Sequence, residues 1–191
     1  LFRSASPTFF ASGASGCVDG FRLENYNSLG PNTNTFIRCT ANNATGYGYY
    51  VGGTGNTFIH PDAEEITSPA VGMSLDGLAH SVVGGNFEGT GVSIDVLATN
   101  CTIEHANVLG FLNIESGVYG TTVIGGNVKY LNFVTGCSNN TAIGVRIGTG
   151  GSLIENGTNN TLIGLYNFNT SAYVTNKIFT TGRSEEHTSE L

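Results

Sequence analysis

Apolar residues recur about every 20 residues through most of the chain, as in a solenoid repeat. One column contains Val83, Ile103, Val123, Ile143 and Ile163. A second column, eleven positions further along, contains Ile94, Ile114, Val134, Ile154 and Val174. We expect both columns to point into a core, because a repeat of this length is a structural unit that buries its apolar residues only by stacking on its neighbours. The pattern therefore predicts a solenoid.

Each repeat contains two short segments of β-forming residues, separated by Gly or Asn. The same kind of triplet occurs upstream, as TFI at residues 35–37 and again at 57–59. Such segments, about three to five residues long and bounded by frequent turn residues, show no helical periodicity. We expect an all-β fold, a single-stranded right-handed parallel β-helix of about eight rungs of 20–24 residues. Residues 60–69 contain two prolines and three acids, and are expected to protrude as a loop.

The pattern also divides the chain into three parts. Residues 35–180 are assigned to the parallel β-helix, and residues 1–34 to irregular rungs at a truncated N-terminal end, because no signal peptide begins at Leu1. Residues 181–191 are expected to be a disordered tail. Within it, residues 183–191 resemble the translation of a DNA-sequencing adapter at every position. We therefore expect this tail to be an artefact rather than part of the folded protein.

Composition narrows the possible partners. Charged residues make up only 11% of the 191 residues, the net charge is −7, and the absence of a basic stripe argues against nucleic acid. No apolar run approaches the roughly 20 residues of a membrane helix, so membrane insertion is not expected. Cysteines occur at positions 17, 39, 101 and 137 without a CxxC pair or a His cluster, so neither a metal site nor a cofactor is predicted. Free thiols are expected, with disulfides as the alternative.

Several local motifs are typical of one group of β-helices. NTxI segments occur at residues 34–37 and 56–59, the segment 84–88 reads GGNFE, and several rungs end in Asn. Over about residues 35–180 these motifs resemble the right-handed parallel β-helix of pectin-lyase-like proteins, and most of all bacteriophage tailspike or tail-appendage proteins. The resemblance implies an extracellular or virion-surface location, a polysaccharide partner and association as a homotrimer. Secreted polysaccharide lyases and glycosidases share the coil pattern.

Acidic residues supply the candidate chemistry. If the second apolar column points inward, one neighbouring outward column reads Asp95, Glu115, Thr135, Glu155 and Thr175. Asp95 and Glu115 would lie one rung apart, about 4.8 Å at the backbone, close to the roughly 5–5.5 Å between the carboxyl groups of retaining glycosidases. We predict Asp95 and Glu115 as a catalytic pair if a sheltered cleft raises one pKa. The alternative is that both are solvated acids at a strand edge.

The other outward column reads Ser93, Asn113, Phe133, Leu153 and Tyr173. Its apolar members suit a platform for sugar rings, an interface between subunits, or a surface covered by a segment outside this chain. On the first interpretation, Phe133, Tyr173, Glu155 and Asn113 would bind substrate.

Cations are scarce in the regular rungs, where Lys129 and Arg146 occupy different columns. A pectate-lyase mechanism, which needs calcium held by clustered acids and a strong base, is therefore disfavoured, and an acidic polymer would be repelled. The sequence favours a surface β-helix that binds, and could hydrolyse, a neutral or weakly charged cell-surface polysaccharide. The alternatives are a secreted polysaccharide-degrading enzyme and a non-catalytic structural or adhesin β-helix.

Overall fold

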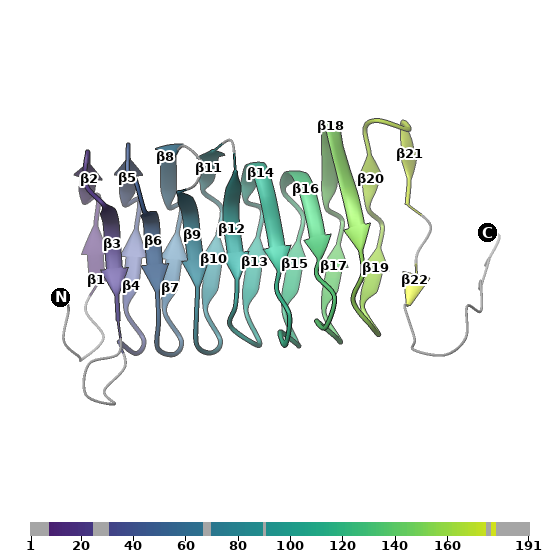
Figure 1. Ribbon diagram of the computed structural model, residues 1–191, viewed down its shortest axis with the longest axis horizontal. Helices are drawn as coiled ribbons and strands as arrows, with labels where there is room; N and C mark the ends of the chain where they lie inside the picture. The colour runs from purple at the N-terminus through teal and green to yellow at the C-terminus, as the bar shows by residue number, and fades with distance from the viewer. Residues whose placement is uncertain (1–7, 25–30, 67–69, 90, 175–176, 179–191) are drawn as a thin grey trace.

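The computed structural model describes residues 8–24, 31–66, 70–89, 91–174 and 177–178. Every regular element in these ranges is a β-strand, and the strands wind into a solenoid whose successive turns stack along one axis (Figure 1). Strands of neighbouring turns pair in parallel, apart from the last strand of each sheet. Within the described ranges no helix could cross a membrane. The predicted all-β parallel solenoid is therefore confirmed.

One wall of the solenoid, the first sheet, consists of three-residue strands, one from each turn. The middle residue of each strand points into the solenoid, and the two outer residues are more exposed. The parallel strands are β1 (Thr8–Phe10), β4 (Thr35–Ile37), β7 (Thr57–Ile59), β10 (Ser81–Val83), β13 (Thr102–Glu104), β15 (Thr122–Ile124), β17 (Thr141–Ile143) and β19 (Thr161–Ile163). The short strand β22 (Lys177–Ile178) pairs antiparallel with β19.

The other strands form the second sheet, which changes along the rod. Four early turns each contribute two strands: β2 (Gly13–Ser15) and β3 (Asp19–Leu23), β5 (Thr40–Asn42) and β6 (Tyr47–Val51), β8 (Asp62–Ile66) and β9 (Val71–Leu75), and β11 (Asn86–Gly89) and β12 (Val92–Val96). Later turns contribute one long strand each: β14 (Asn107–Ile114), β16 (Asn127–Phe133) and β18 (Arg146–Glu155). Because β14 pairs with both β11 and β12, one long strand with an irregular register takes the place of two short strands at this turn.

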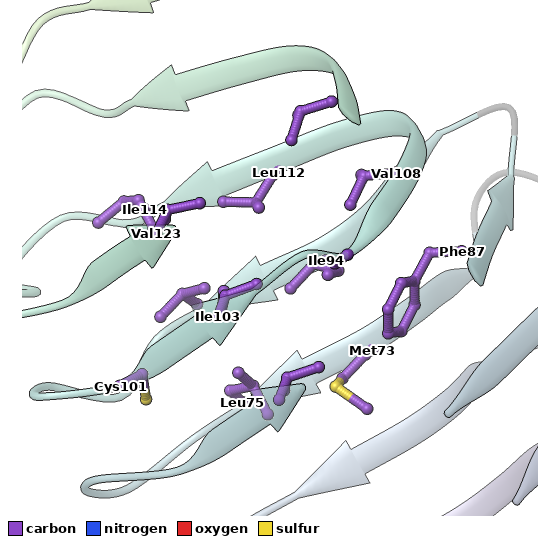
Figure 2. Packing of buried hydrophobic residues seen from close by; sticks show 14 of the residues in the cluster. Met73, Leu75, Phe87, Ile94, Cys101, Ile103, Val108, Leu112, Ile114 and Val123 are labelled. Atoms are coloured by element: carbon purple, nitrogen blue, oxygen red, sulfur yellow. The ribbon is translucent and has the colours of Figure 1, made fainter. Parts of the chain in front are cut away.

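Apolar side chains from both sheets fill the interior. Figure 2 shows part of this core, with labels on Met73, Leu75, Phe87, Ile94, Cys101, Ile103, Val108, Leu112, Ile114 and Val123. In the first sheet, the aligned inward residues are Val82, Ile103, Val123, Ala142 and Leu162. The predicted column is wrong by one residue at three positions, because Val83, Ile143 and Ile163 align with the outward residues Glu104 and Ile124.

The second predicted column is also wrong in register. The aligned inward residues are Ile94, Leu112, Leu131 and Leu153, so the first two steps are shorter than the repeat and the third is longer. Merging two strands into β14 shortens one turn, and the Gly-rich widening at 148–151 in β18 lengthens another. A fixed period could not follow these compensating changes.

Buried polar side chains hold successive turns together at the corner that precedes the first sheet. The backbone N–H of Asn34 donates to Asn56 Oδ1 at 3.0 Å, and that of Asn140 donates to Asn160 Oδ1 at 2.8 Å. His80 interrupts this ladder, because its Nδ1 accepts from the backbone N–H of Asn56 at 3.3 Å. Burial lowers the pKa of His80, so the ring is held neutral.

The limits of the solenoid differ from the sequence expectations. The three strands between Thr8 and Leu23 pair in register with those of the next turn, so this part is regular. Residues 62–66 of the expected loop form strand β8, whose Ala63 and Ile66 are buried. The parallel winding ends at β20 (Tyr166–Asn167), because β21 (Ala172–Tyr173) pairs antiparallel with it. Residues 67–69 and the expected tail, 181–191, lie outside the described residues.

Candidate functional site

The outward surface of strands β3, β6, β9, β12, β14, β16 and β18 carries most of the candidate side chains, and we call it the outer face of the second sheet. One row of aligned residues crosses all seven strands: Arg22, Tyr50, Ser74, Asp95, Asn113, Asn132 and Ile154. Next to it, a shorter row contains Val92, Phe111, Tyr130 and Ser152. Aromatic rings, amides and carboxyl groups thus lie in adjacent rows.

Asp95 and Glu115 meet on this face through a diagonal contact. Asp95 aligns with Asn113, not with Glu115, because the aligned positions of β12 and β14 are closer in sequence than one full repeat. The prediction that the two acids share a column is therefore wrong. Glu115 nevertheless interacts with Asp95, since it follows Asn113 by two positions on the neighbouring strand and raises the pKa of Asp95.

Burial and the neighbouring carboxyl group raise the pKa of Asp95 to about 7. Burial is the larger cause, the charge of Glu115 comes next, and a hydrogen bond from the Asn113 side chain opposes both. The Asp95 Oδ1 atom is buried without a hydrogen-bond partner in the described part of the chain. Asp95 is therefore protonated over a range in which an ordinary Asp is charged, and it can act as a proton donor.

The contact also limits what the pair can do. Retaining glycosidases hold two carboxyl groups about 5–5.5 Å apart so that the sugar carbon fits between them. Asp95 and Glu115 are neighbours whose charges interact, and they could cleave a glycosidic bond only if the sugar carbon fits between them.

Asparagine side chains extend the carboxyl pair along the row. Asn132 Nδ2 donates to Asn113 Oδ1 at 3.1 Å, and the Asn113 side chain hydrogen-bonds to Asp95. All three side chains are partly exposed, so the network is fixed by its own hydrogen bonds while remaining open to solvent. Asn113 is thus placed beside the acids, as a binding group would be.

Two aromatic rings that the sequence analysis missed lie beside this network. Phe111 and Tyr130 stack with ring centroids 4.4 Å apart and planes inclined by 16°. Lys129 Nζ lies 5.4 Å from the centre of the Tyr130 ring. The segments FLN at 111–113 and YLN at 130–132 occur one turn apart in the sequence, and this likeness was the signal that could have identified the pair.

The apolar stripe predicted from Phe133, Leu153 and Tyr173 does not exist. Phe133 is fully buried in the core, aligned with Ile114, and Leu153 packs against the same core. Tyr173 is 74% exposed, but it lies on β21 and contacts the edge of the Tyr166 ring. The error follows from the register, because the assumed column passes from outward to inward positions along the rod.

Glu155 stabilises a turn of the solenoid. Its Oε1 accepts from the backbone N–H of Gly157 at 2.9 Å and from Asn160 Nδ2 at 3.0 Å, so it holds the turn after β18. Burial raises its pKa. Glu155 aligns with Phe133 at an inward position, away from the row that contains Asp95.

The N-terminal end of the same face carries a second polar and aromatic cluster. Arg22 forms ion pairs with Asp19, at 2.6 Å, and with Glu24. Its guanidinium lies 4.6 Å above the centre of the Tyr50 ring, and Tyr50 Oη donates to Asp76 Oδ2 at 3.2 Å. Arg22 is the single cation of this cluster, whereas Asp19, Glu24 and Asp76 are three carboxyl groups, so this end of the face is net negative.

No group of three or more His, Cys, Asp or Glu side chains gathers as a metal site in the described ranges. All four cysteines are free, and Cys39, Cys101 and Cys137 are buried. Burial raises the pKa of the Cys101 thiol to about 11, which makes it a poor nucleophile near neutral pH.

Comparison of the chain with protein-family models, with curated proteins and with solved structures gave no match.

Proposed function

We propose that this protein binds a neutral polysaccharide along the outer face of the second sheet. The observation that carries the proposal is the position of the Phe111–Tyr130 stack in the row next to the Asn132–Asn113–Asp95 network. A sugar ring has an apolar face that packs on aromatic rings and hydroxyl groups that need amide or carboxyl partners. Adjacent rows of these two kinds match both requirements.

The geometry of the solenoid suits a polymer. Adjacent strands lie about 4.8 Å apart, close to the length of one sugar unit in an extended chain, so successive turns can present equivalent groups to successive sugars. The net charge of −7 disfavours a polyanionic glycan. A neutral chain has no such penalty, and it can accept hydrogen bonds from Asn113 and Asn132.

Glycan binding can be tested by comparing two aromatic substitutions. Tyr130→Ala is expected to weaken binding to a responsive glycan by about tenfold, since it removes one stacked ring worth about 1–1.5 kcal/mol. Tyr173→Ala is the matched control, because Tyr173 is exposed but lies away from the Phe111–Tyr130 pair. Isothermal titration with a panel of neutral capsular and plant glycans gives the affinities. Equal affinities of the two variants would contradict the proposed face.

Hydrolysis is the second candidate function, and the raised pKa of Asp95 favours it. A protonated Asp95 would donate to the glycosidic oxygen, and Glu115 would act as the carboxylate partner. Release of reducing ends from the bound glycan measures the reaction. Asp95→Asn together with Glu115→Gln is expected to abolish it, and an unchanged rate in the double variant would leave a binding protein without catalysis.

In its cellular context, we propose a tailspike-like β-helix of the pectin-lyase-like type at the virion or cell surface, active as a homotrimer. The solenoid fold and the open polar face support this proposal. A secreted polysaccharide-degrading enzyme and a non-catalytic adhesin are the alternatives. Light scattering of the full chain distinguishes a trimer from a monomer, and a monomer would count against the tailspike-like assembly.

A further inference from the structure

The outward surface of the first sheet carries a regular repeat of residue types, and this surface is not part of the proposed glycan site. We call it the outer face of the first sheet, and it lies on a different wall of the solenoid from the proposed glycan site. Each of its eight parallel strands begins with Thr, except β10, which begins with Ser81. The third residue is Ile in five of these strands, and the exceptions are Phe10, Val83 and Glu104. Both positions point outward.

These side chains form two straight rows. All pairings between the parallel strands of this sheet keep one register, with no shift from β1 to β19. The side chains therefore repeat at the strand spacing of about 4.8 Å over about 34 Å, in two rows about 7 Å apart. Thr, Ile and Val are branched at Cβ and have few χ1 rotamers, so their hydroxyl and methyl groups are held in place. Figure 1 shows the strands side by side along the rod.

The chemistry of the face excludes several partners. Glu104 is the one charged residue in the two rows, and Phe10, at the first strand, is the one aromatic residue. The two rows contain no amide, no cation and no central aromatic ring, so they lack the usual contacts to a flexible glycan or a nucleic acid.

The size of the face argues against a second copy of the chain. Two rows about 34 Å long and 7 Å apart cover a few hundred Å², whereas a stable protein interface buries about 800 Å² on each partner. The face is nevertheless open, since Ile143 and Ile163 are 37% and 42% exposed. All described strands belong to the walls of the solenoid, so none of them covers the outer face of the first sheet.

We propose that the outer face of the first sheet binds the surface of ice. Water next to fixed methyl groups has restricted orientations, and each Thr hydroxyl can both donate and accept a hydrogen bond. A rigid array of the two groups, repeated at about 4.8 Å, holds first-shell water in a lattice whose period is close to the oxygen repeat of hexagonal ice. The ordered water then joins the crystal without further loss of side-chain entropy.

Inhibition of ice recrystallisation by the full chain tests the proposal. Thr122→Lys, in the middle of the Thr row, is expected to require an about tenfold higher concentration for the same inhibition. Leu109→Lys is the matched control, because Leu109 is 47% exposed on β14 in the second sheet. Glu104→Ile is a gain-of-function variant that removes the interruption in the Ile row, and it is expected to inhibit at a lower concentration than the unmodified chain.

Partition of the protein into a growing ice hemisphere provides a direct binding readout, with circular dichroism as the check that each variant is folded. Activity that is lost in Thr122→Lys, kept in Leu109→Lys and raised in Glu104→Ile supports the proposal. Exclusion of the unmodified chain from ice overturns it, as does equal activity of the two Lys variants. Retention on crystalline cellulose or chitin without ice binding would also overturn it, in favour of a crystalline polysaccharide as the partner.

Discussion

Replacing Asp95 by Asn is expected to stabilise the protein at neutral and alkaline pH. In the folded chain the Asp95 carboxyl group is partly buried beside Glu115, and its pKa rises from 3.8 to about 7. Between these two pH values the folded protein keeps a proton that the unfolded chain has released. The free energy of unfolding therefore decreases as the pH rises through this window, because ionisation is less favourable in the folded state.

The shift sets the size of the effect. Three pH units correspond to at most about 4 kcal/mol, at about 1.4 kcal/mol per unit. Solvent reaches part of the Asp95 side chain and screens its repulsion with Glu115, which reduces the expected loss to about 1–2 kcal/mol. Asn has a similar shape and no charge, so Asp95→Asn should regain this amount at pH 8 and change little at pH 4.

Urea unfolding at pH 4, 6 and 8, followed by circular dichroism, measures the effect. The unmodified chain should lose stability between pH 4 and 8 relative to Asp95→Asn. Glu104→Gln is the control, since Glu104 lies on the first sheet, away from the carboxyl pair, and its replacement also removes one negative charge. The reasoning would be refuted if Asp95→Asn were less stable than the unmodified chain at pH 8, or if the control shifted the profile equally.

Three further predictions concern side chains that are buried and a glycine that lies close to the next turn. Phe133→Ala should lower the free energy of unfolding by about 3–5 kcal/mol in the urea assay, because Phe133 is fully buried. Tyr173→Ala should change it by less than about 1 kcal/mol, and similar losses in the two variants would contradict the inward position of Phe133. Below about pH 6.5 His80 binds a proton in the unfolded chain but resists it in the folded chain, so the free energy of unfolding should fall as the pH drops. His80→Asn should remove this pH dependence, and an equal dependence in the variant and the unmodified chain would contradict the reasoning. Gly48→Ala should lower the thermal midpoint by several degrees, because a Cβ there would collide with the carbonyl oxygen of Gly72 in the next turn; an unchanged midpoint would show that the turns can move apart.

The solenoid could be predicted from the sequence because every turn repeats the same kind of residue pattern. Triplets such as those at 35–37 and 57–59 each supply one strand of the first sheet, and they align in the structure as the sequence suggests. Errors of one residue in a few turns do not alter the class of fold. Turn residues with positive φ, such as Asn100, Asn139 and Asn159, mark the corners in the same way.

The candidate site could not be predicted as well, because it depends on register. A shift of one residue reverses the direction of a side chain, and the sequence offers apolar residues at both positions, as in Val82-Val83 and Leu162-Ile163. Hydrophobicity alone therefore does not decide which of the two is buried. The likeness of the segments 111–113 and 130–132 could pair Phe111 with Tyr130, but their place beside Asp95 follows from the shortened turn between β12 and β14, which only the strand pairing reveals.

The first sheet keeps one register along the rod, whereas the second sheet varies in strand length and register. Turns of different length enter the first sheet in one register, and their extra or missing residues are accommodated on the other side of the rod. Duplication or loss of one whole turn would therefore lengthen or shorten the molecule by a single step of about 4.8 Å without disturbing its remaining turns. Length is thus a trait that can evolve in discrete units, while the second sheet remains free to acquire loops and new side chains.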